Sequence, residues 1–178
     1  MRRNIDAWWP FIERGAEAVV MTASGCGATV REYGHLLAHD PAYAGKAARI
    51  TELTRDLGEI LAAEDRSAWH GRGAAQRIAY HAPCTLQHAQ KKPGLVEKIL
   101  REAGYTLTPV ADSHLCCGSA GTYSILQPKL SKRLLDNKLL HLQGGEPDLI
   151  VTANVGCQLH LQTGADVPVK HWIELFAD

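Results

Sequence analysis

Apolar residues form five short, nearly continuous runs along the chain, and polar or glycine-containing segments separate them. The runs cover residues 18–23, 77–81, 106–110, 149–153 and 168–170. Strands that are continuously apolar, and not alternating, are typical of a parallel sheet buried on both faces. The pattern therefore predicts a mainly parallel sheet.

The segments between these runs carry apolar residues at helical spacing. The longest stripe predicts one helix over residues 42–64. Residues 93–103 and 128–143 each begin with proline and are followed by glycine, which commonly mark the two ends of a helix. Short helices are also expected after Gly156 and after His171. The alternation predicts an α/β fold with helices flanking a mainly parallel sheet.

Two segments far apart in the chain share one pattern. Residues 19–26 and 149–157 each contain an apolar run, then Thr-Ala, a short turn, and Gly-Cys. This similarity indicates one structural unit used twice. We accordingly interpret residues 1–66 as the C-terminal remnant of a first repeat, 67–76 as a linker, and 77–178 as a complete second repeat.

The composition is that of an ordinary globular protein. Of the 178 residues, 46% are hydrophobic and 21% are charged, and 19 basic residues balance 19 acidic ones. The absence of a basic excess argues against nucleic acid as a partner. The sequence has no apolar run long enough to span a membrane and no apolar segment behind Met1-Arg2-Arg3. We expect a cytoplasmic protein with at most peripheral contact with the inner face of the cell membrane.

In a reducing compartment, the five cysteines are better explained by metal binding or redox chemistry than by disulfides. Cys84, the adjacent pair Cys116 and Cys117, and Cys157 each follow a predicted strand. The carboxyl ends of parallel strands share one edge, so these four thiols are expected to converge there. Thiolates select zinc, copper(I) or iron–sulfur centres, and four of them suit either tetrahedral zinc or a cluster.

The other candidates are weaker. Cys26 is interpreted first as a small buried apolar residue and second as a ligand. His160 follows Cys157 closely and could be a ligand, a supporting group or a surface residue. The histidines at positions 81, 88 and 114 are interpreted as hydrogen-bonding or surface residues.

Longer stretches around these residues resemble a known family. They are similar to the iron–sulfur subunits of glycolate oxidase (glycolate dehydrogenase), within the wider cysteine-rich CCG family that is also found in heterodisulfide reductases. The similarity covers essentially the whole chain. It is carried by residues 2–9, 23–27, 32–37, 81–88, 116–123 and 154–160.

The resemblance implies an electron-transfer subunit of an oxidoreductase, without a complete active site of its own. An FAD-binding partner subunit would oxidise glycolate, and electrons would pass through this chain and further subunits towards the respiratory chain. Cys84, Cys116, Cys117 and Cys157 match the ligand positions for a cluster of 4Fe-4S type. Cys26 matches the last cysteine of the preceding repeat.

Two departures from the family keep alternatives open. The sequence lacks ferredoxin-type Cys-x2-Cys-x2-Cys-x3-Cys-Pro runs and resembles the C-terminal portion of such subunits. His160 stands where the heterodisulfide reductase pattern has another cysteine. The first alternative is a related flavin-linked complex that acts on lactate, glycerol 3-phosphate or a heterodisulfide. The second is a zinc-stabilised structural or docking module.

Overall fold

The computed structural model describes residues 1–177 and contains two parallel sheets among flanking helices. The four-stranded sheet has the order β4-β3-β5-β6, and the two-stranded sheet pairs β1 with β2. The predicted α/β class with mainly parallel strands is confirmed. The larger sheet is built from β3 (Arg77–His81), β4 (Thr106–Leu107), β5 (Leu149–Thr152) and β6 (Val169–His171).

Helices cover both faces of the four-stranded sheet, which explains why its central strands β3 and β5 are buried apart from Arg77. Ile78 and Tyr80 pack with Val96 and Trp172 on one face. Ala79 and Ile150 pack with the leucines of the other face. The first face is covered by α6 (Leu95–Glu102) and the 3-10 helix η3 (Trp172–Phe176), and the second by α8 (Pro128–Gln143) and α9 (Val155–Gln162).

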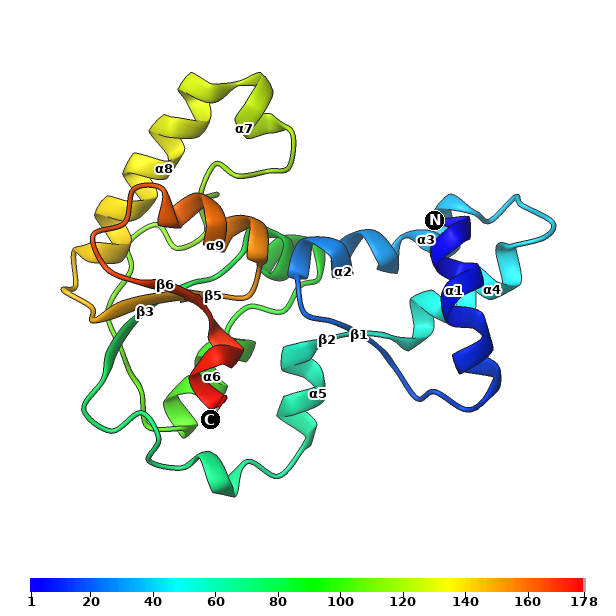
Figure 1. Ribbon diagram of the computed structural model, residues 1–178, viewed down its shortest axis with the longest axis horizontal. Coiled ribbons are helices and arrows are strands. Elements are labelled where there is room, and N and C mark those ends of the chain that lie inside the picture. Colours follow the sequence, from blue (N-terminus) through cyan, green and yellow to red (C-terminus); the bar gives the residue numbers. More distant parts are fainter. Residues whose placement is uncertain (178) are drawn as a thin grey trace.

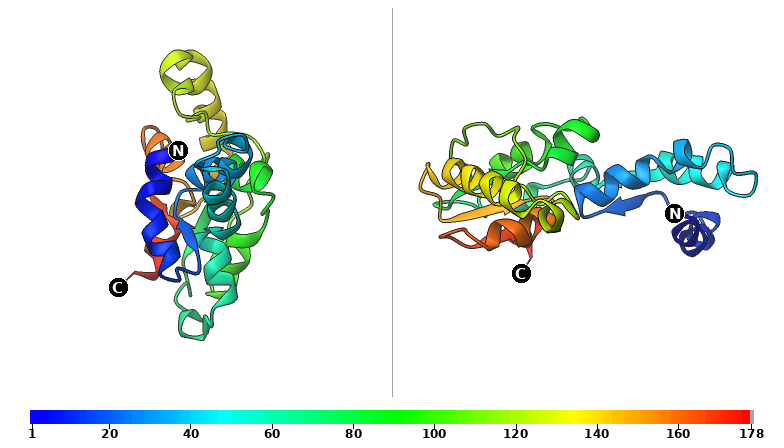
Figure 2. Two further views of the ribbon diagram at one scale, coloured as in Figure 1. Left: turned by 90° about the vertical axis from the view of Figure 1, so that its right-hand side faces the viewer. Right: turned by 90° about the horizontal axis from the view of Figure 1, so that it is seen from above.

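The N-terminal part extends away from this sheet and has its own small core. Ile5, Tyr33 and Ile50 are buried together there. The helices within residues 2–13 and 33–53 lie far from the larger sheet in Figure 1 and in the right-hand view of Figure 2, whereas the helix over residues 57–63 packs against α6. The elements are α1 (Arg2–Glu13), β1 (Val19–Met21), α2 (Ser24–Arg31), α3 (Tyr33–Leu36), α4 (Ala44–Leu53), β2 (Thr54–Asp56) and α5 (Leu57–Ala63).

The prediction of one helix over residues 42–64 is wrong, because β2 interrupts it between α4 and α5. Thr54 ends the first helix by donating its hydroxyl to the carbonyl oxygen of Ile50 at 2.7 Å. Asp56 then begins α5 with a capping box that it forms with Glu59. The strand between them pairs with β1, so tertiary pairing overrides the helical stripe.

Other boundaries differ by a few residues. The strand predicted over residues 106–110 stops at Leu107, two residues before Pro109, which has no backbone N–H to donate. The helix predicted over residues 93–103 begins at Leu95, because Gly94 adopts a φ of +77° that a helix cannot include. The helix predicted over residues 128–143 has those bounds.

The similarity between the two sequence segments is matched in the structure. In each segment a strand is followed by a helix. A second strand, parallel to the first, is then followed by a capping box at which another helix begins. Asp56 with Glu59 forms the capping box in the first unit, and His171 with Glu174 forms it in the second. The two units meet where the backbone N–H of Ser24 donates to the carbonyl oxygen of Ala153 at 3.1 Å.

The segment predicted as a linker, residues 67–76, packs on the C-terminal part. Its 3-10 helix η1 (Ser67–Trp69) places the Trp69 ring on Phe176, with ring centroids 4.1 Å apart. The backbone N–H of Gly73 donates to the carbonyl oxygen of Ala103 at 3.0 Å. Among residues 1–177, no helix is both long enough and apolar enough to cross a membrane.

Candidate metal centre

The structure brings four of the predicted cysteines together at the carboxyl edge of the larger sheet. Cys84 follows β3 and precedes the π-helix η2 (Thr85–Ala89). Cys116 and Cys117 lie in the loop after β4, and Cys157 lies in the first turn of α9. Their thiols form a continuous series of contacts, from Cys84 to Cys116, then to Cys117, then to Cys157.

The thiols in this series shift the pKa values of one another. Contacts with Cys117 and Cys84 lower the pKa of Cys116. The same contacts raise the pKa of Cys84 and of Cys117. A hydrogen bond with Cys117 lowers the pKa of Cys157. The series therefore contains two sites that favour thiolate, and a metal ion would deprotonate the others as it binds.

Backbone and side-chain N–H groups support two of these sulfurs. The N–H of Gly118 lies 3.3 Å from Cys116 Sγ, and the Asn154 side-chain amide lies 3.3 Å from Cys157 Sγ. Gly118 has a φ of +94°, and a Cβ atom there would lie 2.5 Å from the carbonyl oxygen of Ser131. The glycine after the cysteine pair is therefore required both by conformation and by space.

A buried lysine lies beside the thiols. The Lys138 side chain comes from α8, and its ammonium group donates to the carbonyl oxygens of Asp112 at 2.8 Å and Ser113 at 3.4 Å. Burial lowers the pKa of Lys138, while the thiols of Cys117 and Cys116 act against that shift. The lysine thus holds the loop that precedes the cysteine pair and places positive charge near it.

His160 contacts the supporting loop. Its Nε2 lies 3.2 Å from the hydroxyl of Ser131, and that hydroxyl donates to the carbonyl oxygen of Gly118 at 2.9 Å. Because the hydroxyl proton is directed to Gly118, Nε2 is the donor to Ser131. Through Ser131, His160 therefore helps to position the Gly118 turn. The alternative that His160 is itself a metal ligand has less support than this positioning role.

His81 is also part of this site, although the sequence led us to expect only a hydrogen-bonding or surface residue. It is the last residue of β3 and is buried, and one of its ring nitrogens lies within 4.8 Å of the sulfurs of Cys117 and Cys157. The sequence feature that could have indicated this role is the position of His81 at the end of a buried strand. His88 is exposed, and its Nε2 lies 3.2 Å from the carbonyl oxygen of His114.

Cys26 lies outside this group, and its interpretation as a buried apolar residue is wrong. Ser24, Gly27 and Val30 form the buried face of α2, and the spacing of these positions leaves Cys26 on the exposed side.

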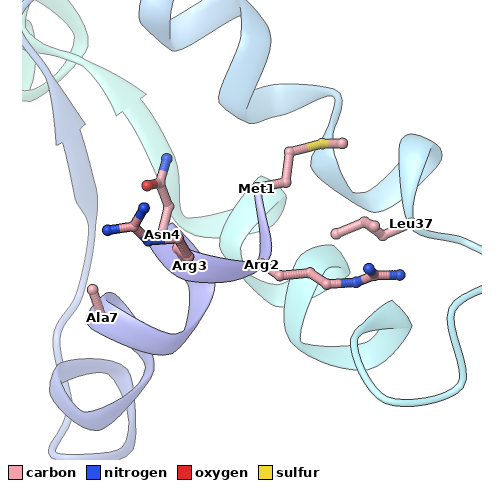
Figure 3. Close-up of a pocket in the computed structure, with 6 residues that line it drawn as sticks. All are labelled: Met1, Arg2, Arg3, Asn4, Ala7 and Leu37. Carbon is pink, nitrogen blue, oxygen red and sulfur yellow. The ribbon is translucent and has the colours of Figure 1, made fainter.

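A surface hollow of about 760 Å³ lies at the N-terminal end of the molecule, away from the thiols. Figure 3 shows Met1, Arg3 and Leu37 among the residues that line it. The hollow has no cysteine or histidine in its lining, and Arg2 is paired with Asp40.

The donor set at the sheet edge fits a soft metal centre. Cys117 and Cys157 are buried, whereas Cys84 and Cys116 are half-buried. Sulfur ligands with an imidazole beside them are suited to zinc and to iron–sulfur clusters, and they are poorly suited to hard cations. Hydrogen bonds from Gly118 and Asn154 are of the type that tunes the reduction potential of a cluster.

Comparison with known proteins finds one family model and several similar proteins that match this chain. Residues 78–162 match the family model of the cysteine-rich CCG domain. The glycolate oxidase iron-sulfur subunit of Escherichia coli K12 is 56% identical over 174 residues, which are 98% of this chain and 42% of that protein. The probable glycolate oxidase iron-sulfur subunit of Bacillus subtilis 168 is 35% identical over 172 residues, which are 93% of this chain and 37% of that protein.

A shorter relative matches over most of its length. Lactate utilization protein A of Geobacillus kaustophilus is 31% identical over 174 residues, which are 90% of this chain and 70% of that protein. This chain therefore spans less than half of the two glycolate oxidase subunits but more than two thirds of lactate utilization protein A. It belongs to the cysteine-rich CCG family that includes the glycolate oxidase iron-sulfur subunits and lactate utilization protein A.

Proposed function

We propose that this chain holds an iron–sulfur cluster, of 4Fe-4S type, on Cys84, Cys116, Cys117 and Cys157. The observation that carries the proposal is that all four cysteines lie at one sheet edge, with the sulfurs of Cys117 and Cys157 within 4.8 Å of each other. The name of the 56% identical relative from Escherichia coli supports an iron–sulfur centre over zinc. When bound, such a cluster supplies one-electron redox chemistry.

The surrounding residues have distinct roles in this proposal. Cys117 and Cys157 hold the buried side of the site, where the sheet and α8 exclude water. Cys84 and Cys116 hold the half-buried side, from which a redox partner can approach. Gly118 and Asn154 donate hydrogen bonds to sulfur, and Lys138 offsets part of the negative charge of the thiolates.

We assign the chain to a flavin-linked glycolate oxidase as an electron-transfer subunit. An FAD-binding partner would oxidise glycolate, and this chain would pass the electrons towards the respiratory chain without binding glycolate itself. We expect the complex in the cytoplasm or peripherally at the inner face of the membrane. The support is the 98% coverage of this chain by the Escherichia coli subunit.

A lactate-oxidising complex is the second candidate. Its support is the match to lactate utilization protein A, of which the chain covers 70%, compared with 42% of the more similar glycolate oxidase subunit. The two functions share the same proposed cluster and differ in the substrate of the partner flavoprotein.

The experiment that tests the function uses the full chain purified anaerobically with its FAD-binding partner. Addition of glycolate should bleach the visible absorption of the iron–sulfur centre, whereas lactate should bleach it slowly or not at all. Faster bleaching with lactate would favour the second candidate. If dithionite bleaches the centre but neither substrate does, the proposed electron donors are wrong.

A further inference from the structure

We propose that His81 is a direct ligand of the metal centre, through Nε2, on the side of Cys117 and Cys157. The inference rests on the proposed cluster: four thiolates give each iron one protein ligand, so His81 would be a second protein ligand at one iron. The starting observation is that a ring nitrogen of His81 and the sulfurs of Cys117 and Cys157 lie within 4.8 Å of one another, with all three residues buried.

The sheet directs His81 to this place. Along β3 side chains alternate between the two faces, so His81 shares the face of Ala79, which packs with Cys117 and Cys157. His81 pairs with Thr152 in the parallel register of β3 and β5. Both residues are the last of their strands, at the edge where the thiols gather.

One ring nitrogen is already held. Nδ1 of His81 lies 3.0 Å from the hydroxyl oxygen of Thr152, and Thr152 is fully buried. This contact fixes the orientation of the ring. When Nδ1 donates to Thr152, the neutral imidazole carries its lone pair on Nε2, which is the form that coordinates metals.

The other ring nitrogen lacks a partner. Among the described residues 1–177, nothing hydrogen-bonds to the buried Nε2 of His81. A buried polar atom without a partner destabilises the fold, so this nitrogen calls for an explanation. A metal ion bound by Cys117 and Cys157 would give Nε2 a partner.

The nearby His160 does not meet the same conditions. Its Nε2 contacts Ser131, which is itself hydrogen-bonded to Gly118. His160 therefore provides a matched control, since it is a histidine next to the same loop with its Nε2 engaged by protein.

The test is pulsed electron paramagnetic resonance on the full chain, reconstituted anaerobically with ferrous iron and sulfide and brought to a paramagnetic state. The protein carries ¹⁵N only in its histidines. A strongly coupled ¹⁵N nucleus is expected in the unaltered chain and in His160→Gln, which keeps a side-chain donor for Ser131, and it should be lost in His81→Ala. If His81→Ala fails to fold, the unaltered chain and His160→Gln decide the matter together.

The outcomes separate this inference from the proposed function. Iron and sulfide binding without a strongly coupled histidine nitrogen overturns the role of His81 and leaves the cluster. The same holds if the coupling persists in His81→Ala or disappears in His160→Gln. A chain that binds no iron and sulfide overturns both proposals.

Discussion

The side-chain amide of Asn154 links the Cys157 sulfur to the other structural unit of the chain. Its Nδ2 donates to Cys157 Sγ at 3.3 Å, and its Oδ1 accepts from the backbone N–H of Gly25 at 3.2 Å. Gly25 lies in the first turn of α2, which also contacts the C-terminal part through Ser24 and Thr85, whose hydroxyls are 2.8 Å apart. The geometry of a proposed metal ligand therefore depends on residues from both units.

Replacing Asn154 by leucine should lower the reduction potential of the bound centre. The amide hydrogen bond stabilises the more negative, reduced state of the centre more than the oxidised state. A difference of about 1 kcal/mol corresponds to roughly 40 mV for a one-electron couple. Potentiometric titration followed by visible absorption measures it. Asn4→Leu, whose side-chain amide donates to the Tyr33 hydroxyl in the N-terminal part, is the control and should leave the potential unchanged.

Lys138→Met should also lower the potential, because it removes a buried positive charge beside Cys116 and Cys117. The expected change is roughly 40 mV, equivalent to about 1 kcal/mol of charge interaction. Lys132 lies on the same helix but is 64% exposed and paired with Asp136. If Lys132→Met shifts the potential as much as Lys138→Met, proximity to the thiols is not the cause.

Gly118→Ala should destabilise the fold and weaken metal retention. The new methyl group would meet the Ser131 carbonyl oxygen at 2.5 Å, and φ is +94°. We expect a loss of about 2 kcal/mol or more in the free energy of unfolding, measured by urea titration. Gly121→Ala, with φ of +60° and nothing within 4 Å of its Cβ, should cost only about 1 kcal/mol. Equal losses would show that the close contact with Ser131 is unimportant.

Glu59→Gln should reduce stability at neutral pH but not at low pH. Glu59 pairs with Arg31 on α2 and with Lys92 at 2.8 Å. Burial alone would raise the pKa of Glu59, but Lys92, the Asp56 N–H and Arg31 together hold it below the usual value.

Because this pKa is lowered on folding, the stabilisation is present above the unfolded-state pKa of about 4.5 and is lost as the pH falls through the folded-state value. The expected difference in stability between the unaltered protein and Glu59→Gln is about 1–2 kcal/mol at pH 7, and it should close as the pH falls through the folded-state pKa of Glu59. Unfolding titrations at several pH values measure it. Glu52 is 66% exposed in its pair with Arg49, so Glu52→Gln is the control and should change the stability at pH 7 by less than about 1 kcal/mol.

The sequence was sufficient to predict the fold class and the grouping of the four cysteines, because both follow from strands whose carboxyl ends share an edge. It was insufficient for β2, since a helical apolar stripe over residues 42–64 concealed a short strand. The Asp56 and Glu59 capping box was the missed signal. Lys138 lies on the buried stripe with Leu135 and Leu142, so helical spacing alone could have located it.

The role of His81 and the exposure of Cys26 depend on packing that short motifs do not encode. His81 becomes a candidate ligand only once the β3–β5 register sets it against Thr152 and the α8–α9 face covers it. Cys26 is exposed because α2 buries the face that carries Ser24, Gly27 and Val30, which leaves Cys26 on the opposite side. Its local sequence nevertheless closely matches that around Cys157.

The most direct test of the proposed cluster is the metal and acid-labile sulfide content of the anaerobically purified chain. We predict a brown protein that contains iron and sulfide in equal amounts, with Cys116→Ser and Cys157→Ser losing both and the exposed Cys26→Ser retaining them. A colourless protein that holds zinc, or full iron content in the Cys116 and Cys157 variants, would contradict the assignment of this site as an iron–sulfur centre.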